Sequence, residues 1–412
     1  MLPGPVRKSG TAYLSPIPNE IYMEIFGYLR PTDPNEWIDA EARQHFRNLA
    51  LVCRFFSSVM LPWIFENLTF VEKDSYSQIS SPLSTTVSAK FCRHVLDGDT
   101  TALLLAKHVQ RWAFLGSPTQ SKWTPAFLSM YFRTFQHLPN LVELSLSNIV
   151  IPKDFFKRLA NVPTLEVLNL DDSLFDGGVQ EKHLKYLESL SLKRLALLRN
   201  SNLKRLIPHL NMSSLIHLDL DLVNGLQGLP PLNSSLPLES LQLCGLEDPL
   251  QVVELLEHTP KLKALHLWVF RPPRDFVLKS QIIPQLTELG ASWPFCAYIL
   301  PGRPISRLKL FSMPDLGRKD EEKILADSTK FVTHLIFPIC SYADVPLWEH
   351  FPGLENLGID IKGFRVTAWG EVCFVSSTQF SCFNESGNAD CQFCIAEMEP
   401  PSEPTFSLPG IP

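Results

Sequence analysis

The stretch LVELSLSNIVIPKDFFKRLANVPTLEVLNL, residues 141–170, decides the fold of this chain. It begins and ends with the same pattern, apolar-x-x-Leu-x-Leu, and the segment DFFKRLANVP between the two copies has apolar residues at helical spacing. On a strand, positions four and six of this pattern lie on one face, whereas positions three, five and seven lie on the other. The stretch therefore predicts two strands that bury the same face, joined by a helix or turn.

The same pattern recurs through most of the chain. It starts at Leu141, Leu165, Leu192, Leu215, Leu238, Leu262, Leu286, Ile305, Val332 and Leu354, and a degenerate copy starts at Val109. After the degenerate copy, successive starts lie between 19 residues (286 to 305) and 27 residues (165 to 192) apart. This period is typical of leucine-rich repeats, whose units are too small to bury their own apolar face and must stack. Unrelated amphipathic helices are the alternative, but they would not keep a near-constant phase over so many copies.

We therefore expect an α/β fold, with a leucine-rich-repeat solenoid over residues 106–369. Its parallel strands should line the concave face, and helices or turns such as QVVELLEHTP (251–260) should lie outside. The remaining divisions are a flexible N-terminus at 1–12, a module at 13–70, a linker at 71–105 and a largely disordered Pro- and Cys-containing tail at 370–412. The polar residues 71–90 predict a loop, and residues 91–108, which connect the module to the solenoid, predict a helix.

A second pattern precedes the repeats, in IPNEIYMEIFGYL (17–29) and FRNLALVCRFFSSVMLPWIFENLTF (46–70). Ile21, Ile25 and Leu29 recur at i, i+4 and i+8, which predicts an amphipathic helix. A second helix is predicted by the three-to-four spacing of Phe46, Leu49, Val52, Cys53 and Phe56, and a third short turn from Val59 to Phe65 should bend at Pro62. So small a unit buries little, so its spare apolar surface is either covered by the solenoid or offered to a partner.

These segments closely resemble the F-box, particularly the fungal form that continues into a Leu-Thr-Phe strand, here Leu68 to Phe70. The chain departs from that family at Ile17, where Leu is usual, and in a polar insert at 30–45 that is longer than usual. The resemblance implies that the module binds a Skp-type adaptor. The residues it assigns to adaptor-facing and internal contacts are Ile17, Pro18, Ile21, Ile25, Leu29, Leu49, Val52, Cys53 and Phe56. The alternative is that the helices simply cap the solenoid.

The resemblance also implies the function, which is that of a substrate-recognition subunit of an SCF-type cullin-RING ubiquitin ligase. Its partners would be the adaptor, the cullin scaffold and an unknown protein substrate held by the repeats. Such a receptor is not an enzyme and needs no cofactor, because ubiquitin transfer is left to other subunits. The runner-up is a leucine-rich-repeat scaffold for protein–protein interaction outside any ligase.

The concave face is the expected binding surface, and the repeat register identifies its residues. Two groups are candidates for substrate binding: an acidic strip of Asp171, Asp219 and Asp221, and an aromatic-basic group of His266, Trp268, Arg307, Lys309 and Phe311. Trp and Arg are the residue types that most often carry interface energy. Ordinary solvated surface is the alternative. An enzyme would need His217, Asp219 and His266 to cluster, but no nucleophile motif or phosphate-binding loop accompanies them.

Composition narrows the class of protein. Of the 412 residues, 45% are hydrophobic and 19% charged, and the net charge is −6, which is typical of a globular protein and argues against a generic nucleic-acid surface. No signal peptide or long apolar run is evident, so we expect no membrane insertion. The nine Cys are scattered, which favours reduced thiols in the cytoplasm or nucleus. In the tail, Cys373, Cys382, Cys391 and Cys394 favour free thiols over a zinc site, since only the last two have zinc-type spacing.

Overall fold

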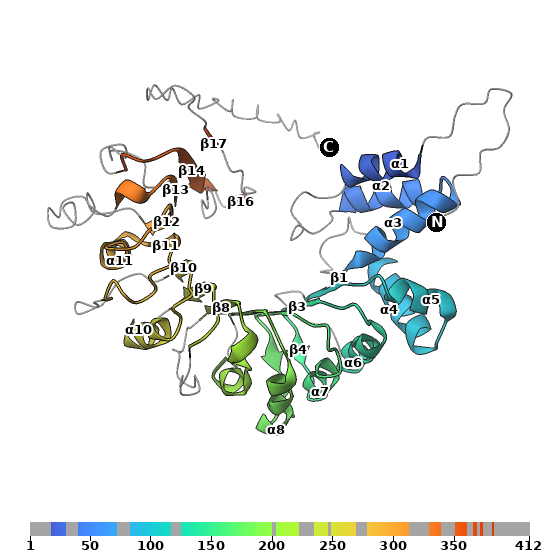
Figure 1. The fold of residues 1–412 in the computed structure, drawn as a ribbon. Helices are drawn as coiled ribbons and strands as arrows, with labels where there is room; N and C mark the ends of the chain where they lie inside the picture. The colour runs from blue at the N-terminus through green and yellow to red at the C-terminus, as the bar shows by residue number, and fades with distance from the viewer. Residues whose placement is uncertain are drawn as a thin grey trace, which may run out of the picture.

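The computed structural model describes residues 18–29, 40–71, 83–116, 125–199, 203–221, 235–245, 249–268, 278–312, 329–338, 351–360, 366–368, 371–373 and 381–382. Its main feature, within those ranges, is a 13-stranded sheet in the order β1-β2-β3-β5-β7-β8-β9-β10-β11-β12-β13-β14-β17. Figure 1 shows that the sheet follows an arc, with the strands along the inner side and helices α6, α7, α8, α10 and α11 outside. The chain is thus a repeat solenoid.

Each predicted repeat forms a strand, which begins two residues after the start of its pattern. The bounds are β2 Arg111–Leu115, β3 Glu143–Ser147, β5 Val167–Asp171, β7 Arg194–Leu198, β8 His217–Asp221, β9 Ser240–Cys244, β10 Ala264–Trp268, β11 Glu288–Ser292, β12 Arg307–Ser312, β13 His334–Pro338 and β14 Asn356–Asp360. β1, Asn67–Val71, precedes them and pairs in parallel with β2. Neighbouring strands are parallel from β1 to β14, and β17, Ser381–Cys382, adds to β14 in the antiparallel sense.

Short helices connect the strands on the outer side. They are α4 Leu83–Leu96, α5 Thr100–Ala106, α6 Pro125–Thr134, η1 Phe135–His137, α7 Phe155–Leu159, α8 Glu181–Leu184, η2 Lys185–Ser189, α9 Leu203–Leu206, η3 Ile207–His209, η4 Met212–Ser214, α10 Pro249–Glu257, α11 Trp293–Ile299 and η5 Thr329–Phe331. In the described part of the chain, two small sheets pair β4 Val150–Ile151 with β6 Leu174–Phe175, and β15 Val366–Ala368 with β16 Glu371–Cys373. The predicted helices in 154–163 and 251–260 are therefore confirmed as α7 and α10.

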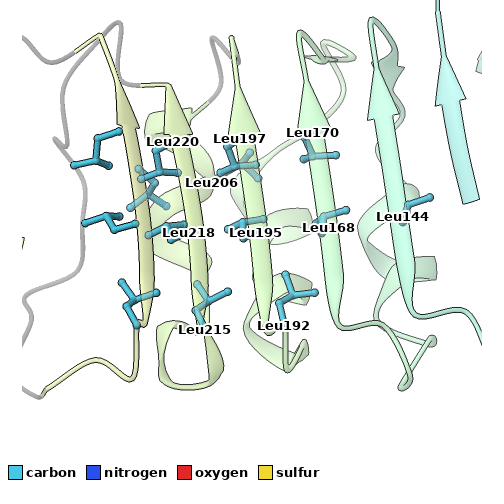
Figure 2. Packing of buried hydrophobic residues seen from close by; sticks show 14 of the residues in the cluster. Leu144, Leu168, Leu170, Leu192, Leu195, Leu197, Leu206, Leu215, Leu218 and Leu220 are labelled. Carbon is cyan, nitrogen blue, oxygen red and sulfur yellow. The ribbon is translucent and has the colours of Figure 1, made fainter. Parts of the chain in front are cut away.

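The core lies between the sheet and the outer helices. Leucines at positions four and six of successive repeats, such as Leu168 and Leu170 on β5 or Leu195 and Leu197 on β7, are almost fully buried. Figure 2 shows them stacked in rows that run across the strands. Each repeat therefore covers the apolar face of its neighbour, which is the stacking that the sequence period requires.

A left-handed residue follows several strands at the same repeat position. Asn148, Asp172 and Gly245 have φ values of 55°, 47° and 71°, and these residue types tolerate that conformation best. The N–H groups of Asn148 and Asp172 donate to carbonyls at the end of the following strand, at 2.9 Å in each case. The turn thus continues the ladder of hydrogen bonds after the strand has ended. Arg199 holds the same position with φ of 48°, although its side chain does not favour it.

Among the residues that the structure describes, three helices precede the sheet: α1 Asn19–Gly27, α2 Ala40–Ala50 and α3 Arg54–Glu66. The prediction of a second helix through Phe56 was wrong, because α2 ends at Ala50 and Cys53 caps α3. Cys53 Sγ accepts a hydrogen bond from the backbone N–H of Phe56 at 3.4 Å. The third helix likewise begins at Arg54 rather than Val59, and it runs through Pro62. Part of the predicted insert, Ala40 to His45, is also helical, whereas residues 30–39 lie outside the described ranges.

The three helices have a hydrophobic cluster of their own. Phe26, Phe46, Phe55, Val59, Met60 and Ile64 form it, and it is separate from the main cluster of the solenoid. Figure 1 shows α1 and α2 lying together beside α3 at one end of the arc. β1 follows α3 directly, as the resemblance implied for Leu68 to Phe70.

The segment between β1 and β2 differs from the predicted linker. Residues 83–90 were predicted to be loop, but α4 begins at Leu83. The helix predicted over 91–108 is interrupted at Gly98, whose φ is 79°, and Asp99 then caps α5 by accepting the N–H of Ala102 at 2.8 Å. Cys92 of α4 and Ala106 of α5 are both fully buried in the main cluster, so the two helices form the outer layer of the first repeats. The predicted flexible N-terminus, at 1–12, lies outside the described residues, as does most of the predicted tail.

Candidate functional site

The concave face follows the predicted register. In β3, β5 and β9, positions four and six are buried, and positions three, five and seven are half exposed. Three of the described strands depart from this alternation: Ala113 on β2, Ala196 on β7 and Gly290 on β11 are buried at position five. All three residues are small, so larger neighbouring side chains can cover them.

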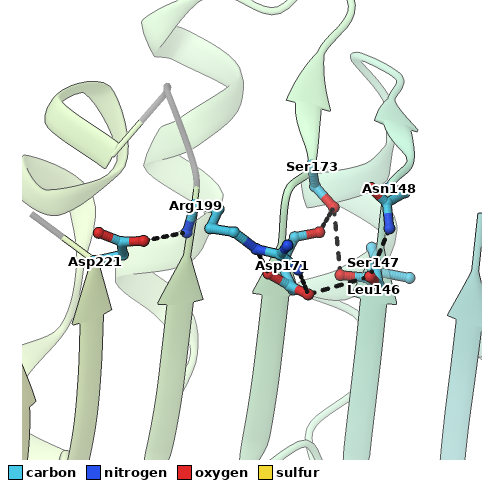
Figure 3. Close-up of polar contacts among 7 residues, drawn as sticks. All are labelled: Leu146, Ser147, Asn148, Asp171, Ser173, Arg199 and Asp221. Carbon is cyan, nitrogen blue, oxygen red and sulfur yellow. Dashed lines mark hydrogen bonds and ion pairs between the residues drawn. The ribbon is translucent and has the colours of Figure 1, made fainter. Parts of the chain in front are cut away.

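Two arginines that the sequence analysis did not include form ion pairs with the acidic strip. Arg199 Nη2 lies 2.6 Å from Asp171 Oδ2 and its Nε 3.0 Å from Oδ1, while its backbone N–H donates to Asp221 Oδ2 at 3.2 Å. Figure 3 shows this chain of contacts, which continues from Asp171 to Ser147. Arg194 Nη2 lies 3.1 Å from Asp219 Oδ2. The three carboxylates are thus partly neutralised within the protein.

A layer of polar contacts continues toward the N-terminal strands. Asn169 Nδ2 donates to Ser145 Oγ at 2.9 Å, and Arg111 lies 3.5 Å from the Glu143 carboxylate. At the end of β9, burial and the charge of Asp221 raise the pKa of the Cys244 thiol to about 11. A thiol with so high a pKa stays protonated at neutral pH and is a poor nucleophile.

The structure brings the aromatic members of the second group into contact. The rings of Trp268 and Phe311 are stacked, with centroids 3.6 Å apart and an interplanar angle of 14°. They come from β10 and β12, with β11 between them. The register explains the contact: Leu310 pairs with Ala291 and Ser312 with Ser292, so Phe311 is an extra residue in a bulge. A bulge redirects the side chain of its extra residue, which here reaches across β11.

Gly290 on β11 provides the space for this contact. A Cβ atom at this position would lie 2.9 Å from His266 Cδ2 and 3.0 Å from Phe311 Cζ, which is too close. The His266 and Phe311 rings therefore occupy the volume that a side chain would take.

Charged groups surround Glu288, which is opposite Arg307 in the register. His266 Nε2 lies 3.1 Å from Glu288 Oε1. The hydrogen bond from His266 holds the pKa of Glu288 below its ordinary value, and Arg307 and Lys309 act in the same direction. Glu288 and Gly290 are positions three and five of the repeat that starts at Leu286, so the register already contained the signal that would have found them. Arg194 is position three of its repeat, but Arg199 lies outside the concave register.

The three residues of the enzyme alternative do not come together. Gln242 on β9 separates Asp219 from His266, because it is paired in register with both. Within the described ranges, no group of three or more His, Cys, Asp or Glu side chains could hold a metal ion. Of the tail cysteines, Cys373 and Cys382 belong to β16 and β17, whereas Cys391 and Cys394 lie outside the described residues.

The residues assigned to adaptor binding divide into two sets, apart from Ile17, which lies outside the described ranges. Leu49, Cys53 and Phe56 are half-buried and pack against the cluster of the three helices. Pro18, Ile21, Ile25, Leu29 and Val52 are exposed, with exposed fractions of 45% for Ile21, 50% for Ile25 and 64% for Val52. Met23 and Leu51 are also exposed and were missed. We call Ile21, Ile25 and Leu29, which recur at i, i+4 and i+8 along α1 and the turn after it, the α1 surface.

No helix in the described part of the chain is both long and apolar enough to span a bilayer. No protein-family model matches the chain, and no curated protein matches it significantly.

Solved structures similar to the chain include three repeat proteins. An internalin from Listeria monocytogenes has 15% identity and a TM-score of 0.37, and the match covers 66% of this chain and 73% of that one. The APL1 leucine-rich repeat domain has 15% identity and a TM-score of 0.24, over 63% and 62%. A leucine-rich repeat protein from Bacteroides eggerthii has 12% identity and a TM-score of 0.26, over 73% and 55%. At these TM-scores the likenesses carry no argument, and the solenoid architecture rests on the strands and register above.

Proposed function

We propose that this chain is a non-catalytic substrate-recognition subunit of an SCF-type cullin-RING ubiquitin ligase. Helices α1 to α3 bind a Skp-type adaptor, and the concave face of the repeats holds a protein substrate. The adaptor links the chain to the cullin scaffold, so the bound substrate is kept at a high effective concentration near the site of ubiquitin transfer.

The α1 surface is the observation that carries this proposal. Three large apolar side chains at i, i+4 and i+8 are exposed on a small module whose own core uses other residues. An exposed apolar stripe of this kind is typical of a protein interaction site. Ile21, Ile25 and Leu29 are also the positions at which the sequence resembles the F-box.

The capping alternative fits the same observation less well. Helices that only capped the solenoid would bury their apolar stripe against it, whereas Ile21 and Ile25 remain about half exposed in the chain. The polar contacts of the concave face likewise fit a binding surface. A leucine-rich-repeat scaffold outside any ligase remains the second candidate, favoured by the concave face itself and independent of α1.

Co-purification of the full chain with a Skp-type adaptor tests the proposal. The native chain should bind, and the double variant I21D/I25D should bind at least about tenfold more weakly, because two charges would enter an apolar interface. Both side chains are exposed, so this variant should keep the native circular dichroism and unfolding transition. Leu104→Asp on α5 is the matched control, since Leu104 is 59% exposed outside the α1 surface. If the native chain fails to bind, the scaffold function replaces the ligase function.

A further inference from the structure

Trp268 stands out on the concave face. It is 43% exposed, although the neighbouring strands present mainly polar side chains at their outward positions. An exposed tryptophan at the inner side of a solenoid is a strong candidate for an interface residue, because Trp contributes more binding energy than most side chains when it becomes buried.

The aromatic pair is held in place before any partner arrives. Phe311 reaches Trp268 because of the bulge in β12, and the absence of a side chain at Gly290 leaves room for the ring. His266 lies against Phe311 edge to face, at a centroid distance of 6.5 Å. Side chains that are already ordered lose little conformational entropy on binding, which favours affinity.

The charges around the pair are mainly positive. Arg307 and Lys309, on the same strand as Phe311, contribute two cations, and Glu288, hydrogen-bonded to His266, contributes one carboxylate. The strip on β5 to β8 has the opposite balance, with three carboxylates against the guanidinium groups of Arg194 and Arg199. The concave face therefore changes from acidic to basic along the arc, and the aromatic pair lies in the basic part.

We propose that His266, Glu288, Arg307, Lys309, Trp268 and Phe311 form a docking site for an acidic peptide segment with an aromatic side chain. The aromatic side chain packs against Trp268, and neighbouring carboxylates of the segment face Lys309 and Arg307, which precede Phe311 on β12. This inference rests on the proposed function in taking the concave face as the substrate surface, and it names the substrate chemistry. The complementarity of charge selects an acidic partner over a basic one.

The probe for this site is a dye-labelled Gly/Ser peptide with one Trp flanked on each side by two Glu residues, titrated into the full chain. Its affinity should fall by about tenfold or more when the flanking Glu are replaced by Lys or the peptide Trp by Ala. The same loss is expected for the protein variants W268A and R307E/K309E. Tyr186→Ala and Lys157→Glu are matched controls, since both residues are exposed outside the site, and they should bind as the native chain does.

Three outcomes would overturn the docking site: no binding of the acidic peptide, equal binding of the Lys peptide, or full affinity in W268A. Binding that appears only after removal of residues 383–412 would also overturn it, because the occupant of the docking site would then be the chain's own C-terminal segment. Adaptor co-purification on the same preparations separates this test from the proposed function. W268A should retain the adaptor and I21D/I25D should retain the peptide, so either part can fail alone.

Discussion

Arg199, at the end of β7, forms a two-pronged ion pair with Asp171 at the end of β5, with Nη2 to Oδ2 and Nε to Oδ1 distances of 2.6 and 3.0 Å. Its backbone N–H donates to Asp221 on β8. One residue in the left-handed conformation thus links three consecutive strands at their carboxyl ends. The arrangement joins residues of three repeats that are far apart in the sequence.

Two substitutions of Arg199 should separate the stability that the ion pair contributes from the cost of the left-handed backbone conformation. Arg199→Ala removes the exposed ion pair and keeps a non-glycine residue at positive φ, so it should lower the free energy of unfolding by up to about 1 kcal/mol. Arg199→Gly removes the same pair but relieves the left-handed conformation, and should be more stable than the Ala variant by about 1 kcal/mol. Urea unfolding of both variants measures the difference. Equal stabilities would show that the conformation costs nothing here.

Replacement of Arg303 should destabilise the protein much more than its position just after α11 suggests. Its guanidinium is buried and donates to the carbonyls of Lys279, Ile282, Ile299 and Pro301. Arg303→Ala would leave these acceptors without their donor and should cost about 2–4 kcal/mol in the free energy of unfolding. Arg205→Ala is the control, because Arg205 also donates to a carbonyl, that of Val179, but is exposed. A loss no larger than in the control would contradict the role assigned to Arg303.

Glu288 should show an acid-dependent contribution to stability. Its pKa is depressed in the folded protein by the hydrogen bond from His266, so the folded state favours the carboxylate. The contribution is present above the unfolded-state pKa, roughly 4.3, and is lost as the pH falls through the lower folded-state value. Compared with Glu288→Gln, the native chain should therefore gain stability above about pH 5, and the two should converge in acid. A difference that stays constant with pH would contradict this assignment.

Cys92 and Cys296 should resist alkylation in the folded chain. Both are fully buried, and burial raises the pKa of the Cys92 thiol to about 12 and shifts that of Cys296 in the same direction. Since the thiolate is the nucleophile, a raised pKa and burial together suppress reaction with iodoacetamide at neutral pH. Mass spectrometry should detect modification at both sites only after denaturation. Cys53, which is half-buried, is the internal comparison and should react earlier.

The sequence alone determined the repeats because their signal is local and is copied many times. The leucines at positions four and six define the buried face of each strand, and even the start of each strand follows from the pattern. The residues at which helices begin and end were harder to predict from the sequence. The boundary between α2 and α3 depends on the Cys53 cap, and the start of α4 at Leu83 lies in a polar stretch that also suits a loop.

The sequence predicted only some of the residues and contacts of the candidate site. The register placed Trp268 and Phe311 on the concave face, but their stacking depends on a bulge in β12 and on the space above Gly290. The pairing of Asp171 with Arg199 joins residues from different repeats, one of them outside the strand register. What the sequence determined was therefore the periodic core. Which outward side chains meet was decided only by tertiary structure, because it depends on how neighbouring repeats align and bend.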